Sequence, residues 1–299
     1  MTLAAAVAEA LGCAVLRVRI LGGTRRVEVA ECVLESGARV VAKRAVAPGA
    51  GLTAEAEGLR LMHRFGRAAS GAWVGPRVPD VLIADHRLLV MEHLDLRAPP
   101  DAGDTVWGRA LARLHRRSSQ RMGSNACRFG FEHDGVLGAT PQSQARCDHW
   151  IDFWRCQRLR PMLELFEDPG VRRLGDQIDG RLDLLLEGAC TASCLIHGDL
   201  WSGNVGWVLD RGSLYPATFD PSACFASREA DLGMTRWMGG FSPSFEAAYR
   251  EVWPLPPNAD RRIRVYTLHH HLNHLHLFGS GYRRGCVSLM ERILADVDR

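Results

Sequence analysis

The segment between residues 197 and 220 holds three side chains of the types that phosphoryl transfer requires. Asp199 and Asn204 lie five residues apart in HGDLWSGN, and Asp220 follows Asn204 by sixteen residues. Transfer of a phosphoryl group requires a carboxylate beside the acceptor hydroxyl, oxygen ligands for Mg²⁺ and a lysine beside the donor phosphates. We therefore interpret Asp199 as a candidate catalytic base, and Asn204 and Asp220 as candidate Mg²⁺ ligands.

One lysine is the candidate for the positive charge beside the donor phosphates. Of the 37 basic residues, Lys43 is the only lysine and the others are arginines. An ammonium is a compact point charge, which a forked guanidinium cannot replace in a confined site. Codon bias could also leave a single lysine by chance, so the residues around Lys43 decide between the two interpretations. Glu55 and Glu57, in a predicted helix that follows, are its candidate ion-pair partners.

The order of these parts along the chain is more specific than any one of them. An isolated Asp or Asn is most often a turn or helix-cap residue. Here a strand lysine, a helix glutamate, HGDxxxxN and a later strand-end aspartate follow one another. Protein-kinase-like phosphotransferases carry their catalytic parts in the same order, so the set indicates a phosphotransferase.

Alternating apolar and polar residues predict the elements that position these side chains. Lys43 falls in the third strand of a predicted antiparallel meander, and the next helix carries Glu55. A loop rich in Pro and Gly precedes that helix, with Thr53 as its expected N-cap. The predicted elements of this half are a short first helix, strands at 14–21, 26–34 and 39–45, a helix at 52–65, and a strand hairpin at 78–85 and 87–94.

The rest of the sequence predicts longer helices, which gives an α+β fold of two lobes. Helices are expected at 104–117 and at 146–166, where Pro161 kinks or splits the second one. We expect a nucleotide-binding lobe at residues 1–93, built on an antiparallel β-sheet with one main helix. A mainly α-helical lobe at residues 94–299 is expected to hold the catalytic and acceptor-binding residues.

Composition excludes several other classes of protein. Of the 299 residues, 46% are hydrophobic and 24% are charged, which is ordinary for a globular chain. The net charge of +3 is spread along the chain, so no nucleic-acid partner is expected. No apolar run could span a membrane, and Glu9 interrupts the apolar start, so neither membrane insertion nor a signal peptide is expected. Nine cysteines, an odd number, indicate reduced thiols and a cytoplasmic protein, while the oligomeric state stays open.

Several motifs together resemble those of the fructosamine kinase (ketosamine-3-kinase) family, in the aminoglycoside phosphotransferase-like branch of the protein-kinase-like fold. They are HGDLWSGNV, DP, READL, MGGF and LNHLHLFGSGY, and the resemblance extends from Gly22 to Tyr282. It implies an enzyme that uses ATP and Mg²⁺ to phosphorylate the 3-hydroxyl of ketosamines, such as fructosamine or ribulosamine, on proteins or small molecules. The alternatives are a phosphotransferase of this fold acting on an aminoglycoside, amino alcohol or other hydroxyl acceptor, and a nucleotide-binding pseudokinase module.

The resemblance also implies roles for individual residues. Asp199 resembles the catalytic base, and Lys43 the phosphate-binding lysine. Glu55, rather than Glu57, resembles the partner of Lys43, because the family's E-A-x-G-L run begins at Glu55. The remaining implied ligands are Asn204 and Asp220 for Mg²⁺, Gly22 and Gly23 for the phosphates, and the backbone of Met91, Glu92 and Leu94 for the adenine.

The acceptor pocket is expected to include Trp201 and His274. Trp201 separates this family from phosphotransferases with HGDLHPGN-type loops, and the alternative is an ordinary buried tryptophan. The family resemblance implies that His270 and Asn273 line the same pocket. His269, His271 and His276 depart from the family and are expected at the surface.

The sequence gives further expectations for the residues around the site. Asp231 and His197 are expected to support the catalytic loop. The alternatives for the histidines and cysteines are a zinc site at His270 and His274, and a metal site at Cys190, Cys194 and His197. Residues 224–227, CFAS, depart from the family pattern after Asp220 and border the expected acceptor site.

Overall fold

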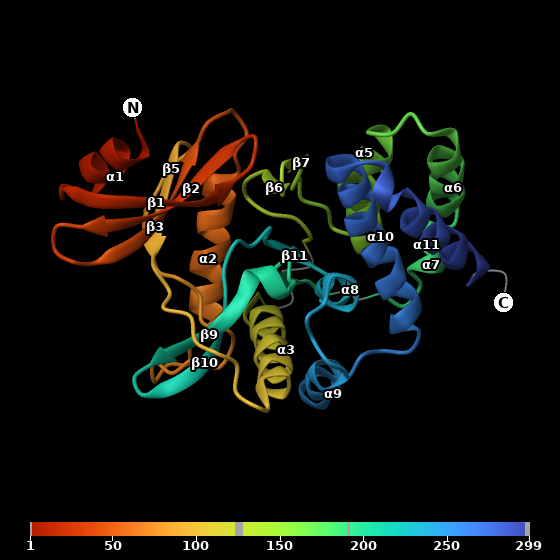
Figure 1. Cartoon of the computed structure of the whole chain (residues 1–299). Coiled ribbons are helices and arrows are strands. Elements are labelled where there is room, and N and C mark those ends of the chain that lie inside the picture. Colours follow the sequence, from red (N-terminus) through yellow and green to blue (C-terminus); the bar gives the residue numbers. More distant parts are fainter. Residues whose placement is uncertain (1, 123–127, 190–191, 297–299) are drawn as a thin grey trace.

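Strands form one end of the molecule and helices the other (Figure 1). The structure, a computed structural model, describes residues 2–122, 128–189 and 192–296. A five-stranded antiparallel sheet has the strand order β1-β2-β3-β5-β4. Its strands are β1 (Val15–Gly23), β2 (Val27–Leu34), β3 (Arg39–Ala45), β4 (Val81–Ala84) and β5 (Leu88–Glu92). The predicted meander and strand hairpin are therefore confirmed.

Helices cover both faces of this sheet, and their packing fixes the direction of Lys43. We call the sheet with α1 (Leu3–Leu11) and α2 (Leu52–Gly66) the N-terminal lobe. Ala42 of β3 lies in the apolar cluster beneath α1, whereas Leu59 of α2 lies in the cluster on the other face. Because side chains alternate along a strand, Lys43 points to the face that α2 covers.

The start of α2 differs from the expected one. Gly51, not Thr53, occupies the N-cap position, with a φ of +74° and no side-chain cap. Glycine adopts this left-handed conformation at little cost, so the turn of the loop rather than a polar cap begins the helix. The predicted apolar side of the helix is buried, namely Leu52, Leu59, Met62 and Phe65.

The remainder of the chain, which we call the C-terminal lobe, is mostly helical. Two long helices, α3 (Gly103–Met122) and α10 (Ala259–Phe278), are surrounded by shorter ones, and α10 packs against α8 and α11. The shorter helices are α6 (Pro169–Gly180), α7 (Leu182–Leu185), α8 (Glu229–Trp237), α9 (Pro243–Val252) and α11 (Arg283–Ala295). The antiparallel sheet with a helical second part is the predicted fold class, whereas the division at residues 93 and 94 stays a prediction.

The helix expected at 146–166 is shorter and is not split at Pro161. It begins at Trp150 as α4 (Trp150–Trp154), and residues 155–159 then form a π-helical turn before α5 (Arg160–Glu164). The backbone N–H of Arg160 donates to the carbonyl of Arg155, five residues earlier. Pro161 has no backbone N–H to donate, and the widened turn directly before it lets the helix continue.

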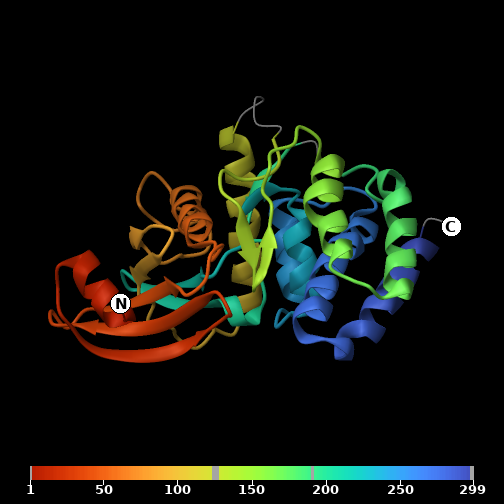
Figure 2. The ribbon, with the colours of Figure 1, turned by 90° about the horizontal axis from the view of Figure 1, so that it is seen from above.

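Three short antiparallel pairs of strands lie between the sheet and α10. They are β6 (Gly135–Leu137) with β7 (Thr140–Gln142), β8 (Cys194–Ile196) with β11 (Cys224–Ala226), and β9 (Val205–Asp210) with β10 (Ser213–Thr218). Figure 2 shows β6 and β7 between the N-terminal lobe and the helices that follow. The β9–β10 hairpin contacts the chain on both sides of β4 and β5, through backbone bridges from Arg77 to Ala217 and from Leu96 to Val208.

Two further features bear on expectations from the sequence. Seven cysteines in the described part of the chain are free thiols. Within the described residues, no helix is both long enough and apolar enough to cross a membrane.

Candidate active site

The β9–β10 hairpin brings Asn204 and Asp220 together from positions sixteen residues apart. Val205 pairs with Thr218, so the residues just outside this pair meet at the open end of the hairpin. The carbonyl of Asn204 accepts hydrogen bonds from Thr218 Oγ1 at 2.8 Å and from the backbone N–H of Phe219 at 3.2 Å. Asp220 follows with a φ of +57°, a left-handed conformation that Asp tolerates better than most residues.

Lys43 joins this hairpin to the N-terminal lobe. Its Nζ lies 2.6 Å from Asp220 Oδ1 and 2.7 Å from Glu55 Oε1. Burial alone would lower the pKa of Lys43, but the two carboxylates raise it above its usual range, so the ammonium stays charged. Glu57 forms no ion pair within the described residues. The lysine and the glutamate singled out in the sequence therefore lie together at the carboxylate of Asp220.

Gly198 determines the shape of the loop that carries Asp199. Its φ of +81° is left-handed, and a Cβ at this position would collide with the backbone carbonyl of Ser222. The backbone N–H of Gly198 donates to Asp231 Oδ1 at 2.7 Å, and that of His197 donates to Asp231 Oδ2 at 2.8 Å. A buried carboxylate thus holds two consecutive amides of the loop, as expected for Asp231.

The imidazole of His197 also holds the loop. Its Nδ1 accepts from the backbone N–H of Asp199 at 3.2 Å, so its Nε2 carries the proton and donates to the carbonyl of Phe219 at 3.0 Å. Burial lowers the pKa of His197, which favours this neutral form. The ring therefore connects the loop of Asp199 to the residue before Asp220, as expected from the sequence.

His115 and Tyr249 extend this support, and sequence reasoning missed both. His115 Nε2 lies 3.1 Å from Asp231 Oδ2, and its Nδ1 lies 2.9 Å from the hydroxyl of Tyr249. All three side chains are buried. A histidine in line with Leu111 and Leu114 of an amphipathic helix looks like an ordinary core residue, so no local signal would have found it.

Asp199 and Asn204 form a hydrogen-bonded pair beside the hairpin. Asn204 Nδ2 donates to the backbone carbonyl of Asp199 at 2.9 Å and to its Oδ2 at 3.2 Å. Burial raises the pKa of Asp199 to about 7, with smaller contributions from the charges of Asp220 and Asp231, while the hydrogen bond from Asn204 opposes the shift. A carboxylate with its pKa near neutrality suits the transfer of a proton from a hydroxyl.

The oxygens of Asn204 and Asp220 fit a magnesium ion. The amide nitrogen of Asn204 is turned to Asp199, which leaves its Oδ1 as the ligand atom on the other side of the amide. The side chain of Asp220 is 43% exposed although it contacts Lys43. One amide oxygen and one accessible carboxylate are hard donors, the type that Mg²⁺ prefers when it also binds phosphate oxygens and water.

A cleft of about 360 Å³ lies between the lobes, next to Asp220. Besides Lys43 and its partner Glu55, five residues are expected from the sequence to bind the nucleotide. All five line this cleft, namely Gly22, Gly23, Met91, Glu92 and Leu94. The carboxylate of Glu92 is engaged by Arg77 Nη2, 2.6 Å from each oxygen, so its contribution to the cleft is its backbone. A Cβ on Gly23 would collide with the carbonyl of Val27, so the turn at the cleft entrance requires glycine.

A second pocket, of about 320 Å³, lies beside Asp199. Asp199, Trp201 and His274 all line it, together with apolar residues of α8 and α10. Trp201 is partly exposed rather than a core residue, and its indole covers Gly203, where a Cβ would collide with the ring. His274 Nδ1 lies 2.9 Å from the carbonyl of His270, one helical turn earlier, so Nδ1 carries the proton and Nε2 is the acceptor.

Two expectations for the other α10 histidines are wrong, because α10 is buried on most of its sides. His269, expected at the surface, is buried and lies 2.8 Å from Gln142 Nε2. His270, expected in the acceptor pocket, lines a separate water-sized cavity beside Arg158. His271 is partly buried and stacks on Trp237, with ring centroids 3.9 Å apart.

The remaining expectations for histidine and cysteine have different outcomes. His276 is exposed, as expected. Asn273 lines the acceptor pocket, as implied by the resemblance, and its amide oxygen accepts from Thr140 Oγ1 at 2.6 Å. Within the described part of the chain, no three His, Cys, Asp or Glu side chains are grouped as ligands for a metal ion. The alternative site that includes Cys190 falls partly outside the described residues.

A sheet lobe, a helical lobe and a Lys–Glu–Asp cluster between them define a protein-kinase-like fold. The chain belongs to the fructosamine kinase family, whose model matches residues 23–296. It is 36% identical over 211 residues to a chloroplastic protein-ribulosamine 3-kinase of Oryza sativa subsp. indica and 33% identical over 228 residues to the ketosamine-3-kinase of Mus musculus. These matches cover 69% of this chain and 58% and 72% of the relatives, so the chain spans less than two thirds of the rice protein.

Solved structures agree with this assignment. A structure assigned to fructosamine-3-kinase from Thermobifida fusca YX-ER1 superimposes with a TM-score of 0.82 at 31% identity, over 98% of this chain and 99% of that one. The aminoglycoside phosphotransferase APH(4)-Ia, in complex with AMP-PNP and hygromycin B, superimposes with a TM-score of 0.61 at 17% identity, over 99% and 98% of the chains. At that identity the second likeness concerns the fold alone.

Proposed function

We propose that this chain is a kinase that transfers the terminal phosphoryl group of ATP to the 3-hydroxyl of ketosamines. The single observation that carries this proposal is a cluster beside the cleft, in which Lys43 contacts Asp220 and Asn204 contacts Asp199, while Asp199 also lines a second pocket. Membership of the fructosamine kinase family supports ketosamines, such as ribulosamine and fructosamine, as the acceptors. We expect the reaction in the cytoplasm, on small or protein-bound substrates.

Each group of the site has one task in this reaction. The Lys43 ammonium binds the donor phosphates, and the backbone of Met91, Glu92 and Leu94, which connects the two lobes, binds the adenine. Asn204 Oδ1 and the Asp220 carboxylate would hold Mg²⁺, which neutralises phosphate charge when it is bound. Asp199 accepts the proton of the acceptor hydroxyl. At the same time the oxygen of that hydroxyl bonds to the γ-phosphorus, and the bond between the γ-phosphorus and the leaving oxygen of ADP breaks. The reaction needs positioning and charge neutralisation, without a covalent enzyme intermediate.

The test is a panel of acceptors incubated with the protein and Mg·ATP. We expect ADP release and a 3-phosphate product with ribulosyl, erythrulosyl or fructosyl amines, and no product with hygromycin B or choline. Turnover of an aminoglycoside or amino alcohol alone would support the other acceptor class. Nucleotide binding without phosphate transfer to any acceptor would support a pseudokinase and overturn the proposal.

Replacement of the catalytic carboxylate gives the matched control for this panel. Asp199→Ala removes the proton acceptor and leaves the nucleotide cleft intact, so we expect kcat on the best ketosamine to fall by about 10² to 10⁴-fold. Calorimetric binding of ATP should be retained. Full activity of Asp199→Ala on a ketosamine would contradict the role of Asp199 as the base.

A further inference from the structure

The pocket beside Asp199 carries a single charged residue, Asp199 itself. Among the residues that the structure describes, no Lys or Arg lines it, and its other walls are almost entirely apolar or aromatic. The lining residues are Leu137, Gly138, Asp199, Trp201, Met234, Met238, Asn273, His274, Leu277, Phe278 and Tyr282. Burial lowers the pKa of His274, so this ring is neutral at pH 7. Among the described residues that line the pocket, a ligand therefore meets one titratable carboxyl group and no cationic side chain.

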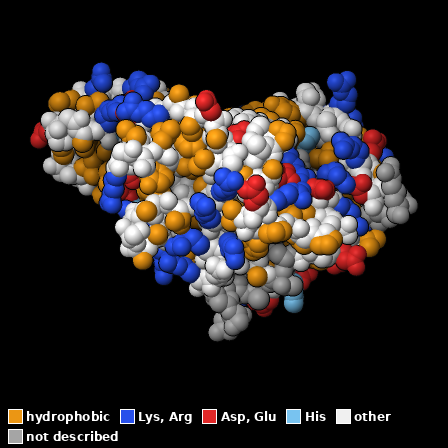
Figure 3. All heavy atoms as spheres, turned by 90° about the horizontal axis from the view of Figure 1, so that it is seen from below, with side chains coloured by type: hydrophobic (Ala, Val, Ile, Leu, Met, Phe, Trp, Pro, Cys, Tyr) orange, Lys and Arg blue, Asp and Glu red, His pale blue; other side chains and the backbone are white. Residues whose placement is uncertain are grey.

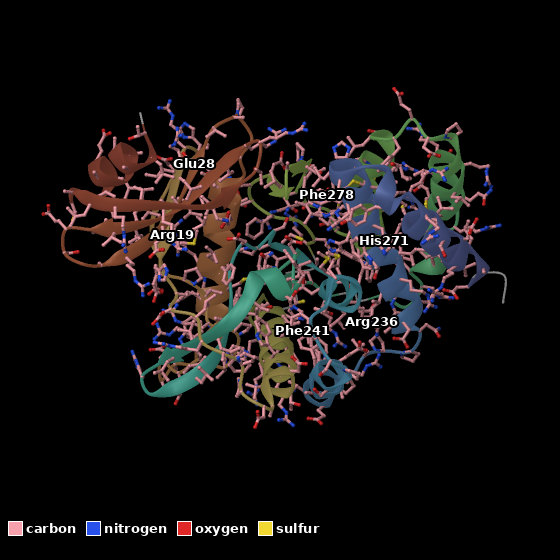
Figure 4. All side chains as sticks on the ribbon, viewed as in Figure 1. Arg19, Glu28, Arg236, Phe241, His271 and Phe278 are labelled. Carbon is pink, nitrogen blue, oxygen red and sulfur yellow. The ribbon has the colours of Figure 1, made fainter. Side chains whose placement is uncertain are left out.

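Aromatic rings form the outer wall of this pocket. The centroids of His274 and Phe278 lie 5.3 Å apart, those of His274 and Tyr282 also 5.3 Å, and those of Phe278 and Tyr282 5.9 Å. Phe278 is 64% exposed although it lines the pocket, which locates it at the mouth. Figure 4 shows Phe278 at the C-terminal end of α10, on the side that faces the N-terminal lobe.

The chemistry of a ketosamine gives this wall a role, and the argument here rests on the proposed function. The reacting 3-hydroxyl must lie at Asp199, and the amine nitrogen is attached two carbons away, at C1. The substituent on that nitrogen therefore leaves the sugar toward the mouth of the pocket. A secondary ammonium is attracted by the faces of aromatic rings, which stabilises the nitrogen between Asp199 and the wall.

We propose that Phe278, Tyr282 and Leu277 form a subsite for the amine substituent of the ketosamine, and that this subsite selects uncharged alkyl or aryl groups. An apolar substituent removes the exposed face of Phe278 from water, which favours binding. A carboxylate one carbon from the nitrogen, as in a sugar adduct of a free amino acid's α-amine, finds no cation in the pocket and loses hydration without compensation. An acceptor with several ammonium groups finds one carboxyl group among the described lining residues, which disfavours aminoglycosides.

Four ribulosamines that differ only on nitrogen test this subsite. The nitrogen carries hydrogen, n-butyl, benzyl or carboxymethyl, and kcat/KM is measured with Mg·ATP. We expect kcat/KM for the butyl and benzyl compounds to exceed that for the carboxymethyl compound by roughly ten-fold or more, since one apolar contact in a pocket discriminates by that order. Equal kcat/KM for the benzyl and carboxymethyl compounds would overturn the subsite.

Two variants assign the selectivity to Phe278. Phe278→Ala should lower the benzyl-to-carboxymethyl ratio of kcat/KM by roughly ten-fold, and Phe278→Leu should restore most of it. The matched control is Leu165→Ala, which removes a 43% exposed leucine that does not line the pocket, and should leave the ratio unchanged. An unchanged ratio in Phe278→Ala would overturn the proposal.

Binding measurements separate failure of the subsite from failure of the proposed function. Calorimetric titration of the four compounds should show the same order of affinity, with or without turnover. Tighter binding of the benzyl compound without phosphorylation of any ketosamine would support the subsite and overturn the kinase proposal. Phosphorylation of all four compounds with equal affinities would do the reverse.

Discussion

Lys43 fits between a carboxylate of each lobe because its ammonium group is compact. Glu55 and Asp220 are both within 2.7 Å of its Nζ, and the Lys43 side chain is 7% exposed. A guanidinium is planar and wider, and it places its donors in a fork. The confined space between the two carboxylates explains why a chain that otherwise uses arginine retains a lysine here.

Lys43→Arg tests this explanation at the scale of one residue. The fork cannot occupy the same space without displacing Glu55 or Asp220, so we expect kcat/KM for ATP to fall by about 10²-fold or more, as when one preorganised donor to the reacting group is lost. The initial rate as a function of ATP concentration measures the effect. Arg19→Lys, at an exposed position on β1, is the control for a change of cation type. Wild-type kinetics in Lys43→Arg would refute the steric argument.

At the scale of elements, a buried ion pair connects α8 to α10. Both oxygens of Glu229 accept from Arg262, Oε2 from Nε and Oε1 from Nη2, each at 2.7 Å. Their side chains are 2% and 0% exposed. Since α8 also carries Asp231, this pair holds the helix that supports the catalytic loop.

Removal of one partner of this pair should destabilise the fold strongly. Arg262→Met leaves the carboxylate of Glu229 buried without its cation, so we expect the free energy of unfolding to fall by about 3–5 kcal/mol. Arg264→Met is the matched control, because Arg264 pairs with Asp296 at the partly exposed surface and should cost less than about 1 kcal/mol. Guanidinium denaturation measures both. Equal losses in the two variants would contradict the importance of burial.

The contrast between α2 and α10 explains what the sequence could and could not predict. In α2 one side is apolar and buried, so its periodicity predicted the helix, whereas the choice of Glu55 over Glu57 came from the family's E-A-x-G-L run. Helix α10 is buried on most sides, so its sequence lacks a polar face that would identify which histidines are exposed. The burial of His269 and the position of His270 depend on packing by other segments, which periodicity does not encode.

At the scale of the molecule, the residues proposed for catalysis and their nearest supports, Asp231 and His197, could be predicted, but the outer supports His115 and Tyr249 could not. Lys43, Asp199, Asn204 and Asp220 belong to motifs whose order is informative, and the structure brings these four together. The link from Tyr249 through His115 joins α9 and α3 to the loop, and such a long-range contact leaves no pattern in either segment. The left-handed backbone of Asp220 is equally a product of the hairpin around it.

The buried histidines make the stability of the whole molecule depend on pH. Burial lowers the pKa of His270 to about 3, whereas an unfolded histidine titrates near 6.5. Below about pH 6.5 the unfolded chain therefore binds a proton that the folded chain does not, and the contribution of His270 to stability is lost as the pH falls. The raised pKa values of Asp199 and Glu55 act in the opposite direction, so the contribution of His270 must be measured as a difference.

His270→Gln provides that difference. We compare how much the free energy of unfolding changes when the pH falls from 7.5 to 5.5. Over this range the wild type should lose about 1.4 kcal/mol more stability than His270→Gln. Guanidinium denaturation at the two pH values measures it. His276→Gln, at an exposed position of the same helix, is the control and should follow the wild type. Parallel pH profiles of the wild type and His270→Gln would show that His270 does not resist protonation.

The single lysine also limits how readily sugars can modify the protein itself. The basic side chains on the face shown in Figure 3 are spread over both lobes and, given the composition, are guanidinium groups. Reducing sugars condense with neutral primary amines, and the one side-chain amine of this chain is buried, charged and held by two carboxylates. If the protein acts on ketosamines as proposed, it offers the sugars around it almost no lysine to modify.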